Sequence, residues 1–101
     1  MAKLNPYSLS SQERKKLLNK FYSFINSLKT RKQTINFFQD LLTLSEKIML
    51  ARRIQIAKLL LKKESYEEIK KKLKVGTSTI INVQRWLKQG HKDYIKFLEK
   101  L

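Results

Sequence analysis

The sequence predicts an all-α protein with six helices, and two observations lead to this fold class. The chain of 101 residues contains two glycines and one proline, which are too few turn residues for an all-β sandwich or barrel. Ser or Thr is followed three residues later by Glu or Gln ahead of several apolar patterns of helical period, and such capping boxes indicate helix starts. These pairs are Ser10 with Glu13, Thr30 with Gln33, Thr43 with Glu46, and Ser65 with Glu68.

The first, second and last predicted helices each carry one apolar face. They span about residues 11–28, 31–42 and 92–101. In the first helix the apolar side chains fall within an arc of roughly 160° at about 100° per residue, whereas in the second helix Phe37 lies away from the apolar side. The residues of these faces are Leu17, Leu18, Phe21, Tyr22, Phe24, Ile25, Leu28, Ile35, Phe38, Leu41, Leu42, Tyr94, Ile95, Leu98 and Leu101.

The third predicted helix, about residues 44–61, is apolar around almost its whole circumference. A helix of this kind is expected to be buried. The other short helices of one chain could barely cover it on every side, whereas a second copy of the chain would cover it easily. The pattern therefore predicts a helical homodimer.

Residues 65–89 have the spacing of a helix-turn-helix motif. A short helix over residues 66–73 is followed by a tight connection at 74–77 and by a second helix over 78–89, which Gly90 ends. The apolar residues of both helices are spaced so that they can share one small core. They are Ile69, Leu73, Val75, Ile80, Val83 and Leu87.

The charge of the chain indicates a polyanionic partner. Lys and Arg number 23 against 8 Asp and Glu, which gives a formal net charge of +15 at pH 7. Such self-repulsion makes sense when a nucleic acid neutralises it. The lysines around the first helix of the motif are expected to contact DNA phosphates; they are Lys62, Lys63, Lys70, Lys71, Lys72 and Lys74.

The outward face of the second helix of the motif has the properties of a major-groove reader. It is small and polar at its N-terminal end, so the helix backbone can approach the base edges closely. Asn82 can read adenine, Arg85 can reach a guanine or a phosphate, and Ile81 can contact a thymine methyl group. The residues expected to contact bases are Thr77, Ser78, Thr79, Ile81, Asn82 and Arg85.

The sequence argues against several other classes of protein. With no cysteine and a single histidine, the chain cannot form a disulfide, a zinc finger or a Cys nucleophile. Because no base with an orienting partner and no phosphate loop is visible, we expect no enzyme activity, no metal and no cofactor. The longest apolar run, residues 48–51, is too short to span a bilayer, and the N-terminus lacks a signal-peptide stretch. We expect a single cytoplasmic domain over residues 1–101.

The chain resembles the tryptophan operon repressors and their uncharacterised relatives. The resemblance rests on SYEEIKKKLKVGTSTI at residues 65–80, on LL at 59–60 and on WLK at 86–88, and it covers about residues 41–101. It implies a six-helix, intertwined homodimer with a helix-turn-helix. It also implies that the first helix and the central helix interlock with those of a second chain.

The resemblance includes departures at the corepressor site. In the repressors, one arginine from the central helix and one from the recognition helix hold the corepressor beside a glycine. Arg52 matches the first arginine, whereas Asn82 and Val83 stand at the other two positions. One charge partner is therefore missing and the space for the ring is partly filled, which argues against tryptophan and leaves any small-molecule corepressor open. Lys74 also stands where helix-turn-helix sequences usually have Gly.

These observations predict a sequence-specific duplex DNA-binding transcriptional regulator. The operator, the regulated genes and the sign of regulation cannot be read from the residues, although the resemblance implies a repressor. Two alternatives stay open: a basic protein that binds structured RNA or the ribosome, and a helical adaptor that binds another protein through the apolar central helix. In the preferred interpretation, two recognition helices about 34 Å apart enter successive major grooves of a two-fold symmetric site.

Overall fold

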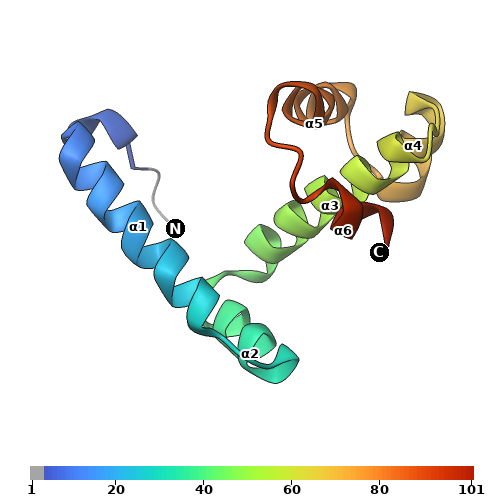
Figure 1. The fold of residues 1–101 in the computed structure, drawn as a ribbon. Helices are drawn as coiled ribbons and strands as arrows, with labels where there is room; N and C mark the ends of the chain where they lie inside the picture. Colours follow the sequence, from blue (N-terminus) through green and yellow to red (C-terminus); the bar gives the residue numbers. More distant parts are fainter. Residues whose placement is uncertain (1–3) are drawn as a thin grey trace. The chain divides into compact units, whose positions relative to one another are not determined.

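The computed structural model describes residues 4–101, which are helical apart from short connections and the chain ends (Figure 1). The prediction of an all-α fold with six α-helices is therefore confirmed. The chain forms two compact units, Met1–Leu41 and Leu42–Leu101, and each is described by itself. The first contains η1 (Pro6–Ser8), α1 (Ser11–Ser27) and α2 (Arg31–Leu41); the second contains α3 (Leu44–Leu61), α4 (Tyr66–Leu73), α5 (Thr77–Gln89) and α6 (Ile95–Glu99).

Most predicted helix ends lie within one residue of the observed ends, and α6 is the exception. The helix expected over residues 92–101 is limited to Ile95–Glu99. Before it, the Ile95 N–H bonds to the Lys92 carbonyl at 3.3 Å, which closes a turn rather than a helical i→i+4 bond. The short 3₁₀ helix η1 was not predicted; Asn5 begins it by accepting a bond from the Tyr7 N–H at 3.0 Å.

The capping boxes explain why the helices begin where they do. At α3, the Thr43 N–H donates to Glu46 Oε1 at 2.8 Å and the Glu46 N–H donates to Thr43 Oγ1 at 3.2 Å. Ser10 and Glu13 form the same reciprocal pair at α1, and Thr30 and Gln33 form it at α2. At α4 the structure contains half of the predicted box, in which the Glu68 N–H donates to Ser65 Oγ at 3.2 Å.

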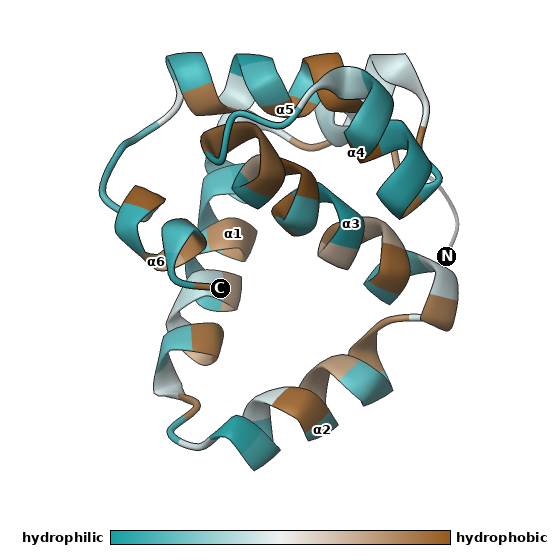
Figure 2. Cartoon of the chain, turned by 90° about the vertical axis from the view of Figure 1, so that its right-hand side faces the viewer, coloured by the Kyte–Doolittle hydropathy of each residue, from teal (hydrophilic) through white to brown (hydrophobic). Residues whose placement is uncertain are grey.

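The core of the second unit lies where α4, α5 and α6 pack on α3. Its buried residues come from all four helices, and the three most deeply buried large side chains are Ile56, Ile69 and Ile80. Figure 2 shows hydrophobic residues along the whole length of α3. The predicted core of the helix-turn-helix is confirmed, because Ile69, Ile80 and Val83 are buried while the rest of that set is half-buried against them: Leu73, Val75 and Leu87.

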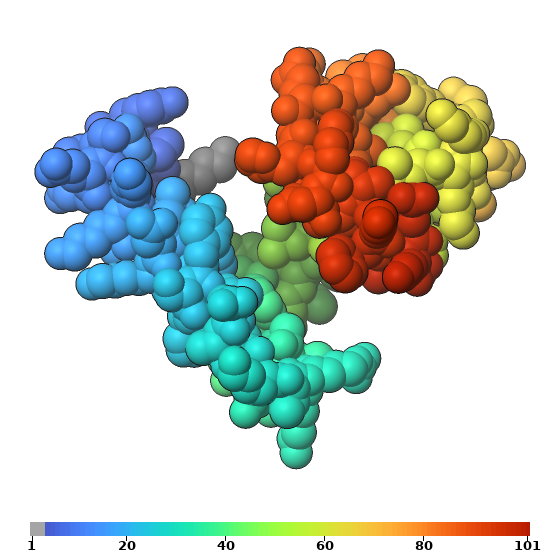
Figure 3. Space-filling model, viewed as in Figure 1, coloured from blue at the N-terminus to red at the C-terminus, as the bar shows by residue number. Residues whose placement is uncertain are grey.

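The expectation that the third helix is buried all round is wrong for the single chain. Ile56 and Ala57, in the C-terminal half of α3, are fully buried. In its N-terminal half, Met49 is 53% exposed, because α4, α5 and α6 pack on the other half, around Ile56 and Ala57. Figure 3 shows α6, in red, over α3, while part of the green surface of α3 stays uncovered. The other exposed large apolar residues of this half are Leu44, Ile48 and Leu50, and Ile54 just beyond its midpoint is also exposed.

The first unit contains no buried side chain among its described helices. Phe24 of α1 packs on Phe37 of α2 with ring centroids 4.7 Å apart. Phe37, which the helical projection placed away from the apolar side of α2, therefore makes the aromatic contact to α1. Most of the predicted apolar face of α1 stays exposed, and its members include Leu17, Leu18, Phe21, Tyr22 and Phe24. Across residues 4–101, the structure contains no helix with the length and apolar character to cross a membrane.

Candidate nucleic-acid interface

The turn between α4 and α5 is set by Lys74. Its backbone is left-handed, with φ 54° and ψ 49°, and its N–H bonds to the Lys70 carbonyl at 2.9 Å, which ends α4. Gly76 then has an ordinary extended backbone, and a Cβ placed on it would meet nothing within 4 Å. The conformation that favours glycine therefore falls on Lys74, at the position where helix-turn-helix sequences usually have Gly.

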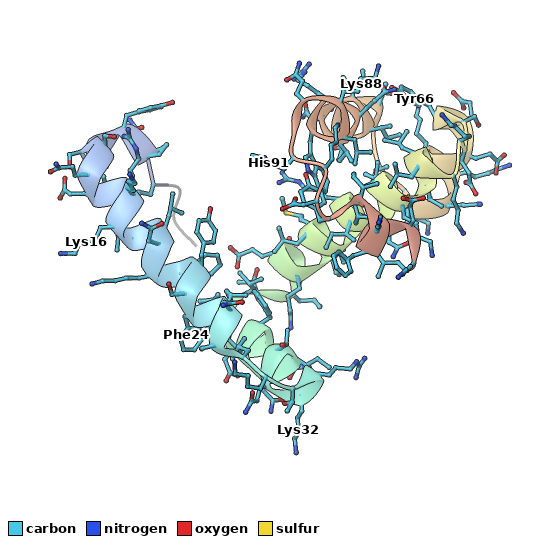
Figure 4. The ribbon with its side chains drawn as sticks, viewed as in Figure 1. Lys16, Phe24, Lys32, Tyr66, Lys88 and His91 are labelled. Carbon is cyan, nitrogen blue, oxygen red and sulfur yellow. The ribbon has the colours of Figure 1, made fainter. Side chains whose placement is uncertain are left out.

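Packing of its inner face orients α5. Ile80 is fully buried and Val83 is 3% exposed, and both belong to the core around α3. The Tyr66 hydroxyl of α4 donates to Gln84 Oε1, so a hydrogen bond joins the two helices of the motif. Figure 4 shows Tyr66 on α4 beside α5. With this face held inward, the opposite face of α5 points into solvent.

The outer face of α5 contains the residues predicted to contact bases. Five of the six are exposed, and Thr79 is half-buried. Ile81 is 41% exposed although its neighbour Ile80 is fully buried, because the two side chains project from different sides of the helix. The Arg85 guanidinium donates to Asn82 Oδ1 at 3.5 Å from one helical turn away. The exposed members are Thr77, Ser78, Ile81, Asn82 and Arg85.

The six predicted phosphate contacts differ in their surroundings. Lys72 Nζ binds both carboxylate oxygens of Glu64, at 2.8 and 2.9 Å. This hydrogen-bonded ion pair raises the pKa of Lys72, so its charge is both retained and compensated. Lys70 is half-buried. The remaining four are exposed, and they are Lys62, Lys63, Lys71 and Lys74.

A cavity between α3 and α5 identifies an arginine that the sequence reasoning missed. Arg53 lines it together with Thr79, Asn82, Val83 and Trp86. Arg53 precedes the buried Ile56 and Ala57 by three and four residues, so its helical position was the signal that could have found it.

Arg52, the predicted effector-binding residue, lies on an adjoining cavity. That cavity is also lined by Arg53, Lys74 and Gly76, so it brings three cationic side chains to the start of α5. Arg52 also lines a third hollow beside the exposed N-terminal half of α3, with Leu44 and Ile48. Arg53, rather than Arg52, is thus the arginine of α3 that shares a cavity with Asn82 and Val83.

Trp86 and Tyr94 are both half-buried against the core of the second unit. The Trp86 indole N–H donates to the Tyr94 hydroxyl, and the ring centroids are 6.0 Å apart. His91 stands in the connection between α5 and α6, where it is exposed (Figure 4). Within residues 4–101, no group of three or more His, Cys, Asp or Glu side chains could hold a metal ion.

The fold and this site define a helix-turn-helix protein, and comparisons with known proteins identify its family. The family described as Trp repressor protein matches residues 16–101, so this chain belongs to the Trp repressor family, whose members are regulators rather than enzymes. The match reaches into α1, well beyond the segment from residue 41 onward on which the sequence resemblance rested.

Two individual proteins are similar over most of the chain. The uncharacterised protein YerC of Bacillus subtilis (strain 168) is 33% identical over 88 residues, which cover 87% of this chain and 85% of YerC. A crystal structure from Staphylococcus aureus, of a protein provisionally described as a Trp repressor, is 28% identical with a TM-score of 0.76. That likeness covers 97% of this chain and 94% of the other.

Proposed function

We propose that this protein is a sequence-specific, duplex DNA-binding transcriptional regulator that inserts α5 into the major groove. The observation that carries the proposal is the two-sidedness of α5. Ile80 and Val83 hold one side in the core, while Asn82 and Arg85 stand exposed on the other. A helix fixed in this way presents a rigid set of side chains to base edges.

The chemistry of the exposed face fits base recognition. Thr77 and Ser78 are small, so the first turn of α5 can approach the groove floor without steric hindrance. In the proposed complex Asn82 pairs with an adenine, Arg85 reaches a guanine or a phosphate, and Ile81 contacts a thymine methyl group. The net charge of +15 supplies the non-specific attraction that brings the duplex to this face.

We propose that the working unit is a homodimer. The N-terminal half of α3 and the apolar face of α1 are exposed in the single chain, with Met49 at 53% and Leu17 at 57%. Exposed apolar surface of this kind marks an association site. A second copy of the chain is the partner that the resemblance to the tryptophan operon repressors implies. Two α5 helices would then read a two-fold symmetric site with half-sites about 34 Å apart. Sedimentation equilibrium tests the dimer.

We propose that tryptophan is not the corepressor of this regulator. Asn82 is uncharged, and Val83 lines the cavity that Arg53 shares with both residues. A tryptophan carboxylate would therefore find one cationic partner from α3, and the Val83 side chain takes up room beside the ring. Arg52 and Arg53 stay candidates for binding another anionic effector. We also propose that the protein acts in the cytoplasm, where a bacterial transcriptional regulator meets its DNA.

The decisive experiment is selection of bound sequences from a random duplex pool, performed with and without added amino acids. We expect a symmetric consensus with half-sites one helical turn apart, unchanged by tryptophan. Competition with a structured RNA at the same salt concentration tests the RNA-binding alternative. Failure to enrich any sequence, or stronger binding to the RNA, would refute the proposed function.

A further inference from the structure

Two lysines of the helix-turn-helix region have a backbone conformation that disfavours lysine. Among residues 4–101, Lys63 and Lys74 are the non-glycine residues with positive φ, at 67° and 54°. In this left-handed region the Cβ atom of an L-residue crowds the carbonyl oxygen that follows it, whereas glycine has no such conflict. Lys63 and Lys74 therefore cost the protein some backbone strain.

Both lysines stand at helix ends where glycine is the usual residue. At the end of α3, the Lys63 N–H bonds to the Leu60 carbonyl at 3.0 Å and the Glu64 N–H bonds to the Leu59 carbonyl at 3.1 Å. This is the Schellman pattern, whose left-handed residue is most often glycine. Lys74 ends α4 through its bond to the Lys70 carbonyl. The fold alone would favour glycine at both places.

The helix dipole does not explain the choice of lysine. A positive charge is favourable near a helix C-terminus, but it can be placed in the last turn without left-handed backbone. Lys58 already occupies the last turn of α3, and α4 has three lysines in its own last turn. The helix dipoles therefore do not account for lysine at the strained positions 63 and 74.

The charges of these two lysines are available to a partner. The one ion pair that the structure contains over residues 4–101 joins Lys72 to Glu64, so Lys72 is compensated within the chain. Lys63 and Lys74 are exposed. Lys74 also lines the cavity at the start of α5 with Arg52 and Arg53, next to the helix proposed to enter the groove.

We propose that Lys63 and Lys74 are the two dominant phosphate contacts of this protein, one at each end of α4. The inference rests on the proposed function and deepens it by ranking six lysines that the sequence could not distinguish. The eight residues of α4 span about 12 Å, so the two ammonium groups reach different phosphates. Strained backbone conformations cluster at functional positions, where the surrounding structure holds them.

Replacing both lysines by glycine tests this directly, since glycine relieves the strain while removing the charge. We expect the Lys63→Gly, Lys74→Gly variant to be at least as stable as the parent in urea. Its affinity for duplex DNA should nevertheless fall about fivefold per lysine at about 0.15 M salt, and the slope of log affinity against log salt should lose about two units. Weaker resistance to urea would refute the premise that the fold disfavours lysine, and unchanged affinity would refute the phosphate contacts.

Three controls separate charge position from total charge. Lys63→Arg with Lys74→Arg keeps both charges and should bind like the parent. Lys96→Gln with Lys100→Gln removes the same number of charges from exposed positions outside the motif and should keep the parent slope. Lys72→Gln should change the slope little, because Glu64 already compensates Lys72. If the parent protein does not bind duplex DNA, the proposed function is refuted. If the parent binds and the Lys63→Gly, Lys74→Gly variant binds equally well, only this inference is refuted.

Discussion

Asn82 is the residue whose substitution most directly tests base reading. Its carboxamide oxygen accepts a hydrogen bond from Arg85 at 3.5 Å, so the two side chains present a joint polar surface on α5. We expect Asn82→Ala to cost about 1 to 3 kcal/mol at one base-pair position and little at the others. Competition binding with singly substituted duplexes measures this profile.

Gln89 provides a matched control for that experiment. It is an exposed amide at the far end of the same helix, outside the first turns that approach the base edges. Gln89→Ala should leave the specificity profile unchanged. An Asn82→Ala profile identical to that of the parent would remove Asn82 from the readout.

Single residues also mark where sequence reasoning reached its limit. The absence of glycine at position 74 was visible as a departure from helix-turn-helix usage, but the left-handed backbone of Lys74 could be established only with coordinates. The choice between Arg52 and Arg53 depended on a rotation of about 100° around α3. Burial of Ile56 and Ala57 fixes that rotation, and burial of a uniformly apolar helix cannot be read from its pattern.

At the scale of the element, α5 offers adjacent isoleucines with opposite environments. Ile80 is fully buried and Ile81 is 41% exposed. Ile80→Ala should lower the free energy of unfolding by about 2 to 5 kcal/mol, since it leaves a cavity in the core. Ile81→Ala should leave stability nearly unchanged and weaken binding to sites with a thymine beneath it.

Chemical denaturation and duplex binding of the two alanine variants measure these effects separately. Equal losses of stability would contradict the orientation of α5 described above. A loss of affinity confined to Ile80→Ala, under conditions where both variants are folded, would contradict the outward role of Ile81.

The capping box of α3 predicts a dependence of stability on pH. The Thr43 backbone N–H, followed by the Thr43 hydroxyl, lowers the pKa of the Glu46 carboxylate from its usual 4.5. A carboxylate whose pKa is lower in the folded state stabilises the fold above pH 4.5, and this stabilisation disappears as the pH falls through the lowered pKa. Stability should therefore decline over that acidic range.

Glu46→Gln isolates this contribution. A glutamine can still accept the bond from the Thr43 N–H, as Gln33 does from Thr30 at α2, but it does not titrate. The variant should lose less stability than the parent between neutral pH and about pH 3. Thermal unfolding across that range gives the comparison, and parallel curves would contradict the assignment to Glu46.

Helix starts were the best-predicted elements of this fold, for a physical reason. The side chains that accept bonds from the first N–H groups of α1, α2 and α3 are close to them in sequence. Ser10, Thr30 and Thr43 therefore predict these helix starts. Helix ends depend more on tertiary packing. The prediction for α6 extended too far because the residues before Ile95 form a turn, in which the Ile95 N–H bonds to the Lys92 carbonyl.

At the scale of the whole molecule, the exposed half of α3 predicts self-association. Ile48 is 43% exposed, and a charge there would be tolerated by an isolated chain but not by an apolar interface. Ile48→Lys should therefore shift sedimentation from dimer to monomer at concentrations where the parent is dimeric. Gln89→Lys, which adds the same charge at an exposed position of α5, should leave the assembly unchanged.

If the parent protein sediments as a monomer, the proposed dimer is contradicted, and a different protein is favoured as the partner of α3.

From the sequence, α3 has more apolar surface than one chain of this size can cover. The exposure of its N-terminal half agrees with that prediction. What the sequence could not indicate was which half is covered within the chain. That division follows from the packing of α4, α5 and α6 near Ile56 and Ala57.

Trp86, whose indole N–H donates to the Tyr94 hydroxyl, can also serve as a natural fluorescent reporter. Trp86 is the single tryptophan of the chain, it follows Arg85 directly, and it borders the cavity that contains Arg53 and Asn82. A molecule that enters this cavity should therefore change the polarity around the indole. Emission from one natural fluorophore can then follow occupancy of the cavity in real time, without a dye.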